Sequence, residues 1–229
     1  MSTFSVPPIH PKGWPFVAGF FVIAVMLGFV WGPLFWIGLI LTLWCAYFFR
    51  DPARTTPVDP WLVTSPADGL VVQVGMRKPP PELGVDLEPR CCIGIFMNVF
   101  DVHVNRTPVA GTITRRLYHA GKFLNASLDK ASDENERMSW AVRPHGYAEE
   151  VFLVQIAGLV ARRIVPFVGV GSSVEAGERV GLIRFGSRCD IYLPPGLIPR
   201  VLVGQRCIAG ETVLADGAAT YPARSGRVS

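Results

Sequence analysis

GSSVEAGERV at residues 171–180 and GQRCIAGETV at residues 204–213 share the pattern GxxxxAGExV, and the two copies begin 33 residues apart. Glycine at such positions suits tight turns between short strands. The pattern therefore predicts a β-rich fold that contains two quasi-equivalent hairpins. The alternative is a turn sequence that recurs without structural equivalence.

Short apolar runs interrupted by Gly and Pro fill much of the chain on both sides of this repeat. Runs such as GLVVQVG, CCIGIFMNVFDVHV and CDIYLP have the composition and length of strands. The polar stretch from Ala126 to Arg137 could be a helix or a loop. We therefore expect a mainly β domain, of the β-rich α+β class.

The N-terminal region has a different character. No residue from Gly13 to Phe49 is charged, in a chain whose mean hydropathy is +0.34. A single helix of this length would span roughly 55 Å, against about 30 Å of membrane hydrocarbon. Gly32-Pro33 interrupts the segment near its middle. We expect two helices that form a membrane hairpin, which either crosses fully or re-enters from one side.

Four regions follow: a cytoplasmic tail (1–12), the membrane hairpin (13–49), a proline-rich linker (50–60) and one catalytic domain (61–229). Basic residues flank both ends of the hairpin, which predicts that both ends face the cytoplasm. A cleaved signal peptide is the alternative, but a second apolar run follows at once. The net charge of +4 suits an anionic membrane surface. No basic run indicates nucleic-acid binding.

The cysteines and the common motifs exclude several classes of site. The five cysteines lack CxxC spacing, so we expect reduced thiols and no metal site. The chain contains no phosphate-binding loop motif of the Walker or GxGxxG type. GVGSS at residues 169–173 departs from the serine-hydrolase pattern GxSxG because it lacks the final glycine.

Polar residues inside apolar runs are the remaining candidates for chemistry. FGSR at residues 185–188 places Gly186-Ser187 within a strand-like run. Asp68 lies in SPADG, where an ordinary turn is the alternative. On a strand, Asp101, His103 and Asn105 would share one face, although a single His is more often structural. A serine beside a base is a recurring nucleophile arrangement, but the spacing does not indicate its target.

The sequence resembles the phosphatidylserine decarboxylase family in its short, membrane-anchored bacterial form. The resemblance covers nearly the whole chain. It rests on the order and spacing of these elements: FFRDPART, SPADG, FDVHVNRTPVAG, GKFLNASLDKASDENER, VGSSVEAGERVG and FGSR.

The resemblance implies self-cleavage between Gly186 and Ser187. Ser187 Oγ attacks the Gly186 carbonyl, and β-elimination then separates a β chain (1–186) from an α chain (187–229). Residue 187 becomes a pyruvoyl group, the expected cofactor. This ketone binds the serine amine of the lipid and accepts the electrons released with CO₂, so that phosphatidylserine becomes phosphatidylethanolamine.

The resemblance also implies roles for individual residues. Asp68 matches the aspartate implicated in self-cleavage, and His103 the proton donor of decarboxylation. Arg106 stands where the family has a second His, the expected base, although Arg is a poor base. Either His103 serves both steps, or Asp68 acts with Arg106 orienting it. His119 and Asn125 fall in a segment close to the site but have no assigned role.

Arg188 also differs from the family pattern, which often has Thr after the serine. The expected location is the bacterial inner membrane, with the catalytic domain facing the cytoplasm. Expected partners are phosphatidylserine, the two chains of one precursor and a second copy in a homodimer, with no nucleic acid. The alternatives are a decarboxylase of another serine lipid, such as archaetidylserine, and a non-catalytic membrane-anchored β module.

Overall fold

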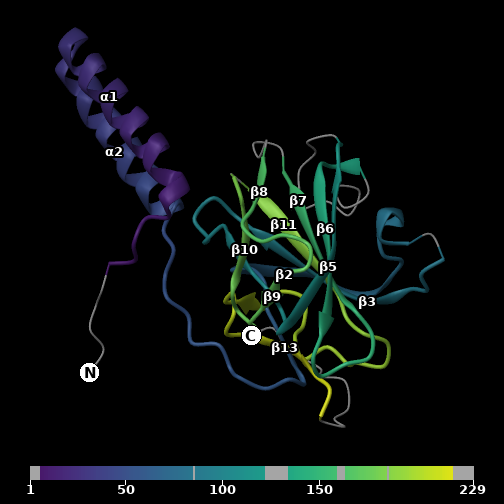
Figure 1. Ribbon diagram of the computed structural model, residues 1–229. Helices are drawn as coiled ribbons and strands as arrows, with labels where there is room; N and C mark the ends of the chain where they lie inside the picture. Colours follow the sequence, from purple (N-terminus) through teal and green to yellow (C-terminus); the bar gives the residue numbers. More distant parts are fainter. Residues whose placement is uncertain (1–5, 85, 122–133, 159–162, 185, 219–229) are drawn as a thin grey trace, which may run out of the picture. The chain divides into compact units, whose positions relative to one another are not determined.

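The computed structural model describes residues 6–84, 86–121, 134–158, 163–184 and 186–218. Within these residues the chain forms two compact units, and the boundary between them in the sequence falls between Ala53 and Arg54 (Figure 1).

The first unit is a helical hairpin. A 3-10 turn, Pro11–Gly13, leads into α1 (Trp14–Val30), and α2 (Gly32–Phe48) returns alongside it (Figure 1). Trp31 is extended, with φ −160°, and Pro33 occupies the first turn of α2, where a proline needs no intrahelical hydrogen bond. The hairpin prediction is therefore confirmed. The helix from Pro11 to Val30 is long and apolar enough to anchor the chain in a membrane.

Small residues bring the two helices close together. A Cβ placed on Gly38 of α2 would lie 2.5 Å from the Cβ of Ala24 of α1. A Cβ placed on Gly28 would lie 2.9 Å from the Cβ of Phe35. Such close backbone approach is the usual way in which helices associate within lipid.

The second unit is built from antiparallel strands and one 3-10 turn, η2 (Pro81–Leu83). In chain order the strands are β1 (Leu62–Thr64), β2 (Gly69–Arg77), β3 (Arg90–Met97), β4 (Val104–Arg106), β5 (Gly111–His119), β6 (Arg137–Pro144), β7 (Val151–Ala157), β8 (Ile164–Pro166), β9 (Ser173–Val174), β10 (Arg179–Ile183), β11 (Ser187–Tyr192), β12 (Arg206–Cys207) and β13 (Val213–Asp216).

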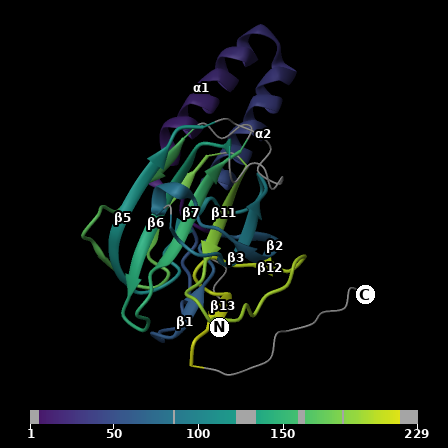
Figure 2. The same cartoon turned by 90° about the vertical axis from the view of Figure 1, so that its right-hand side faces the viewer.

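A curled eight-stranded sheet carries most of this unit, in the order β12-β2-β3-β11-β7-β6-β5-β9 (Figure 2). A three-stranded sheet, β4-β10-β8, and the pair β1-β13 complete it. The expected β-rich fold is confirmed. Arg137 begins β6, so the stretch from Ala126 is not helical up to that residue, and residues 126–133 lie outside the described part.

Strand β11 lies in the middle of the large sheet, between β3 and β7 (Figure 2). Every one of its six residues is buried. Cys189 and Ile191 pack into the main hydrophobic core, and Tyr192 packs into a smaller core on the opposite face. Alternation along the strand places Ser187 on the face of the main core and Arg188 on the other.

The sequence repeat corresponds to two equivalent structural units. Gly177 and Gly210 both have positive φ, 77° and 76°. The backbone N–H of Gly177 donates to the carbonyl of Thr107, and the N–H of Gly210 donates to that of Ser65. Val174 pairs with Gly111 as Cys207 pairs with Gly69. The predicted equivalence of the two copies is therefore confirmed, although the strands that flank each turn pair with other strands and form no hairpin.

The equivalence extends to the segments against which the repeats pack, SPADG (65–69) and TPVAG (107–111). A Cβ at Gly69 or Gly111 would lie 2.2 Å from a backbone oxygen of the neighbouring strand, so both positions require glycine. Asp68 of the first segment occupies the position that Ala110 holds in the second. The two segments thus share one backbone arrangement, but only the first carries a carboxylate, that of Asp68.

Candidate active site

The Gly186-Ser187 bond lies where a turn enters β11. Gly186 has φ +65°, the left-handed region that glycine adopts without cost, and no heavy atom lies within 4 Å of the position of a Cβ. The next residue, Ser187, is fully buried and pairs with Met97 of β3 and Ala157 of β7. A half-buried glycine in the left-handed region therefore directly precedes a fully buried serine.

His103 is fully buried immediately before β4, and its ring touches this turn. The backbone nitrogen of Gly186 lies 3.3 Å from Nε2, and the carbonyl oxygen of Asp101 lies 3.0 Å from Nδ1. Because an amide N–H donates and a carbonyl accepts, Nδ1 carries the proton and Nε2 presents its lone pair. The basic nitrogen of His103 thus faces the peptide segment that would be cleaved.

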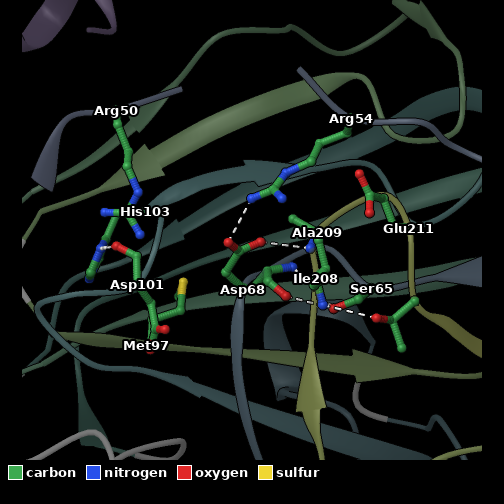
Figure 3. Close-up of polar contacts among 12 residues, drawn as sticks. Arg50, Arg54, Ser65, Asp68, Met97, Asp101, His103, Ile208, Ala209 and Glu211 are labelled. Carbon is green, nitrogen blue, oxygen red and sulfur yellow. Dashed lines mark hydrogen bonds and ion pairs between the residues drawn. The ribbon is translucent and has the colours of Figure 1, made fainter. Parts of the chain in front are cut away.

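Asp68 lies between two donors (Figure 3). Its Oδ2 is 2.6 Å from a guanidinium nitrogen of Arg54, and its Oδ1 accepts the backbone N–H of Ala209 at 2.8 Å. Burial raises the pKa of Asp68 above its ordinary value of 3.8, although Ala209 and Arg54 act in the opposite direction. The charge of Asp101 raises this pKa further, which places Asp101 within electrostatic reach of Asp68.

Asp101 also connects the loop before His103 to β12. Its Oδ2 accepts the backbone N–H of Asn98 at 2.9 Å, and its Oδ1 forms an ion pair with Arg206 of β12. These contacts hold the turn that carries the Asp101 carbonyl. That carbonyl is hydrogen-bonded to His103 (Figure 3). The orientation of the imidazole is therefore set by a braced loop.

Arg106 is directed toward the repeat turns. Its NH1 donates to the carbonyl of Gly177 at 2.8 Å. A Cβ on Gly210 would lie 3.2 Å from its Cδ, so the side chain passes close to the second repeat as well. The guanidinium thus binds a turn carbonyl, which is a structural contact.

The structure brings Gly186, Ser187 and His103 together, with Asp68 near Asp101. His119, at the end of β5, is exposed. Asn125 lies outside the described residues.

The sequence did not predict a chain of hydrogen-bonded, buried side chains beneath Ser187. Trp140 Nε1 donates to Gln155 Oε1 at 2.9 Å, and Gln155 Nε2 donates to Asn105 Oδ1 at 2.8 Å. Asn105 Nδ2 then donates to Met97 Sδ at 3.3 Å, and Ser187 Oγ lies 3.9 Å from the same sulfur.

The indole N–H can only donate, so it determines the direction of both amides. Two sequence signals pointed to members of this chain: Asn105, which shares a strand face with His103, and a lone Gln within the apolar run VFLVQIA. Nothing in the sequence marked Met97.

A family model for phosphatidylserine decarboxylase matches residues 41–215. The chain belongs to the phosphatidylserine decarboxylase family. The match spans Asp68, His103 and Ser187, and it confirms the resemblance inferred from the motifs. Phosphatidylserine decarboxylases are lyases of phospholipid biosynthesis, and membership supports a decarboxylase activity of this kind. Among the residues that the structure describes, no group of three His, Cys, Asp or Glu side chains could hold a metal ion.

Proposed function

We propose that this protein converts phosphatidylserine to phosphatidylethanolamine with a pyruvoyl group that it makes from Ser187 by cutting its own chain after Gly186. The observation that carries the proposal is the contact between His103 Nε2 and the backbone nitrogen of Gly186 at 3.3 Å. It brings a basic nitrogen to the residue that directly precedes the bond broken in the proposed self-cleavage.

In the proposed first step the Ser187 hydroxyl attacks the Gly186 carbonyl while His103 takes the hydroxyl proton at Nε2. The amide becomes an ester as the Ser187 nitrogen leaves. Loss of the Ser187 α-proton then breaks the Cβ–Oγ bond and releases a chain that ends in the Gly186 carboxylate. The dehydroalanine left at position 187 tautomerises to an imine, which water hydrolyses to the pyruvoyl ketone with release of ammonia. Asp68 lies near enough to interact with Asp101 but is held by Arg54, so its role in these steps is electrostatic.

The surroundings of Ser187 fit the group that would replace it. A pyruvoyl group ends in a methyl, formed from the Ser187 Cβ, and the Met97 thioether beside that position suits both a hydroxyl and a methyl. The main core on this face excludes water. When present, the ketone supplies the electron sink that no side chain offers. His103, once protonated, would return a proton to the substrate carbon.

The helical hairpin would hold this site at its substrate, since a two-tailed lipid hardly leaves the bilayer. We assign the protein to the bacterial inner membrane, with the second unit in the cytoplasm, on the basis of the uncharged hairpin and its basic flanks. A homodimer remains an expectation by analogy with the family.

Intact mass of the purified full-length protein tests the proposal, with Ser187→Ala as the control. We expect two chains that meet between residues 186 and 187, the shorter one lacking a free amine. The Ser187→Ala protein should stay whole. A single intact chain in both preparations would overturn the self-cleavage mechanism. Release of CO₂ from phosphatidylserine, compared with a serine ether lipid in mixed micelles, then identifies the substrate.

A further inference from the structure

Arg188, the second residue after the proposed cleavage site, carries a charge that is entirely buried. Arg188 exposes 0% of its surface, and Asp190, two residues along β11, exposes 1%. Arg188 Nε lies 2.5 Å from Asp190 Oδ1, and the guanidinium also donates to Gln73 Oε1 of β2. The group is held by partners from two strands on the sheet face opposite Ser187.

A glycine creates the space for this guanidinium. Gly94 of β3 lies between Gln73 of β2 and Asp190 of β11 in the sheet register. A Cβ on Gly94 would lie 2.5 Å from a guanidinium nitrogen of Arg188. Three adjacent strands therefore form a socket that any larger residue at position 94 would fill.

A buried ion pair in such a socket adds little to the stability of the fold. Desolvating an ion pair offsets most of its attraction, and apolar residues of similar volume are often equally stable. The smaller core on this face contains Cys92, Phe152 and Tyr192, so an apolar residue at position 188 would have suitable neighbours. The distinctive feature of Arg188 is its position, directly after the residue that would become the catalytic group.

Cutting the chain would remove one of the two restraints on the position of residue 187. Before the cut, the Gly186 bond and the strand ladder restrain it from both sides. After the cut, residue 187 is a chain terminus, and termini fray unless they are tied down. The proposed catalytic group would then sit at the end of β11, where small displacements disturb a reaction geometry strongly.

We propose that Arg188 is a positioning residue that clamps the new end of the α chain, so that the catalytic group at position 187 stays in place after the backbone is cut. This inference rests on the proposed self-cleavage. The clamp acts through the Asp190 and Gln73 contacts and leaves the cutting step itself unaffected. Arg188 therefore matters for the cleaved enzyme and little for the precursor.

The test uses the full-length protein with Arg188→Lys, which keeps the charge but loses the planar, forked donor geometry. Gln73→Met removes one contact while leaving the ion pair, and it supports the test if Arg188→Lys fails to fold. Arg90→Lys is the matched control. Arg90 is 7% exposed and lies 3.1 Å from Glu149, at the opposite end of β3 from Met97, the residue that pairs with Ser187.

Three quantities are compared: extent of cleavage by intact mass, hydrogen exchange of the peptide that begins at residue 188, and the kcat and KM of CO₂ release. We expect normal cleavage, exchange faster by about tenfold in the cleaved form, and kcat lower by about tenfold with KM unchanged. In the uncut Ser187→Ala background the same variants should exchange at the parental rate.

Unchanged exchange and kcat in both variants would overturn the clamp while the proposed function stands. Equally faster exchange in the uncut background would also overturn it, because Arg188 would then be a general stabiliser. An unmodified protein that never cleaves would instead refute the proposed function, and the clamp with it.

Discussion

The Nε2 atom of His103 lies 3.3 Å from the backbone nitrogen of Gly186, while Nδ1 of the same ring lies 3.0 Å from the carbonyl oxygen of Asp101. One ring therefore bridges a braced loop and the peptide segment proposed for cleavage. We propose on this ground that His103 is the base for self-cleavage, in which case no second histidine is needed at position 106.

Replacing His103 should nearly abolish self-cleavage. In His103→Gln an amide retains hydrogen-bonding capacity but cannot take a proton, so we expect the cleavage rate to fall by at least about 100-fold. Intact mass followed over time measures the rate. His119→Gln is the control, because His119 is exposed at the end of β5. Near-normal cleavage of His103→Gln would show that another group is the base.

Arg54 should set the acidic limit of self-cleavage through Asp68. Its guanidinium is one of the groups that lower the pKa of Asp68, while burial, the dominant cause, raises it. Arg54→Met therefore raises the pKa of Asp68 further. If the ionised carboxylate is needed, the acidic limb of the cleavage profile moves to higher pH. Arg54→Lys should move it less, and identical limbs for all three proteins would contradict the role.

The same pKa shift predicts how stability depends on pH. A carboxyl whose pKa is raised by folding stabilises the fold when protonated, and this contribution is lost as pH rises through the folded-state pKa. Because folding raises the pKa of Asp68 above 3.8, stability is lost as pH rises from 3.8 through the higher folded-state pKa. Arg54→Met should enlarge this pH-dependent loss of stability. Thermal unfolding across pH in the Ser187→Ala background measures the loss with and without Arg54. Equal pH dependence of the two proteins would contradict the prediction.

Arg106 should prove structural. Its NH1 donates to the carbonyl of Gly177, and we expect Arg106→Met to lower the free energy of unfolding by about 1–3 kcal/mol, the usual effect of removing one charged hydrogen bond. The shape of the cleavage profile against pH should not change. Arg179→Met, at an exposed position beside the same turn, provides the comparison. A shifted pH profile in Arg106→Met would restore a direct role in the chemistry.

Gly186 and Gly69 should respond differently to alanine. Gly186→Ala meets no neighbour within 4 Å, so its cost is the left-handed backbone, about 1–2 kcal/mol. We expect a folded protein that cleaves more slowly. Gly69→Ala would place a methyl 2.2 Å from the backbone oxygen of Phe96, and we expect it to be severely destabilised. Thermal unfolding distinguishes the two, with Gly171→Ala as an open-turn control; equal losses would contradict the geometry.

Met97 should orient the Ser187 hydroxyl. Met97→Leu conserves volume but removes the sulfur, so the hydroxyl is free to visit its other rotamers, and we expect cleavage about three- to tenfold slower. Asn105→Leu should have a similar effect, and the double variant should be no slower than either single one. Met138→Leu, in the same core, is the control. Additive effects would show that the two side chains act separately.

Local patterns in the sequence were sufficient for the framework. The uncharged segment from Gly13 to Phe49 with Gly32-Pro33 at its centre predicted the helical hairpin, because helix length and a proline break depend on neighbouring residues alone. The GxxxxAGExV repeat predicted equivalent turns, since a positive φ is a local demand for glycine. Motif order likewise identified the family before any contact was known.

Only the tertiary structure decided which polar groups meet. Gly186 and His103 are separated by 83 residues, and the socket of Arg188 joins β11 to β2 and β3, with Arg188 and Gln73 separated by 115 residues. Such contacts depend on strand register, which a linear pattern does not specify. For the same reason the Met97 sulfur beneath Ser187 and the turn carbonyl that binds Arg106 became visible only when the sheets were assembled.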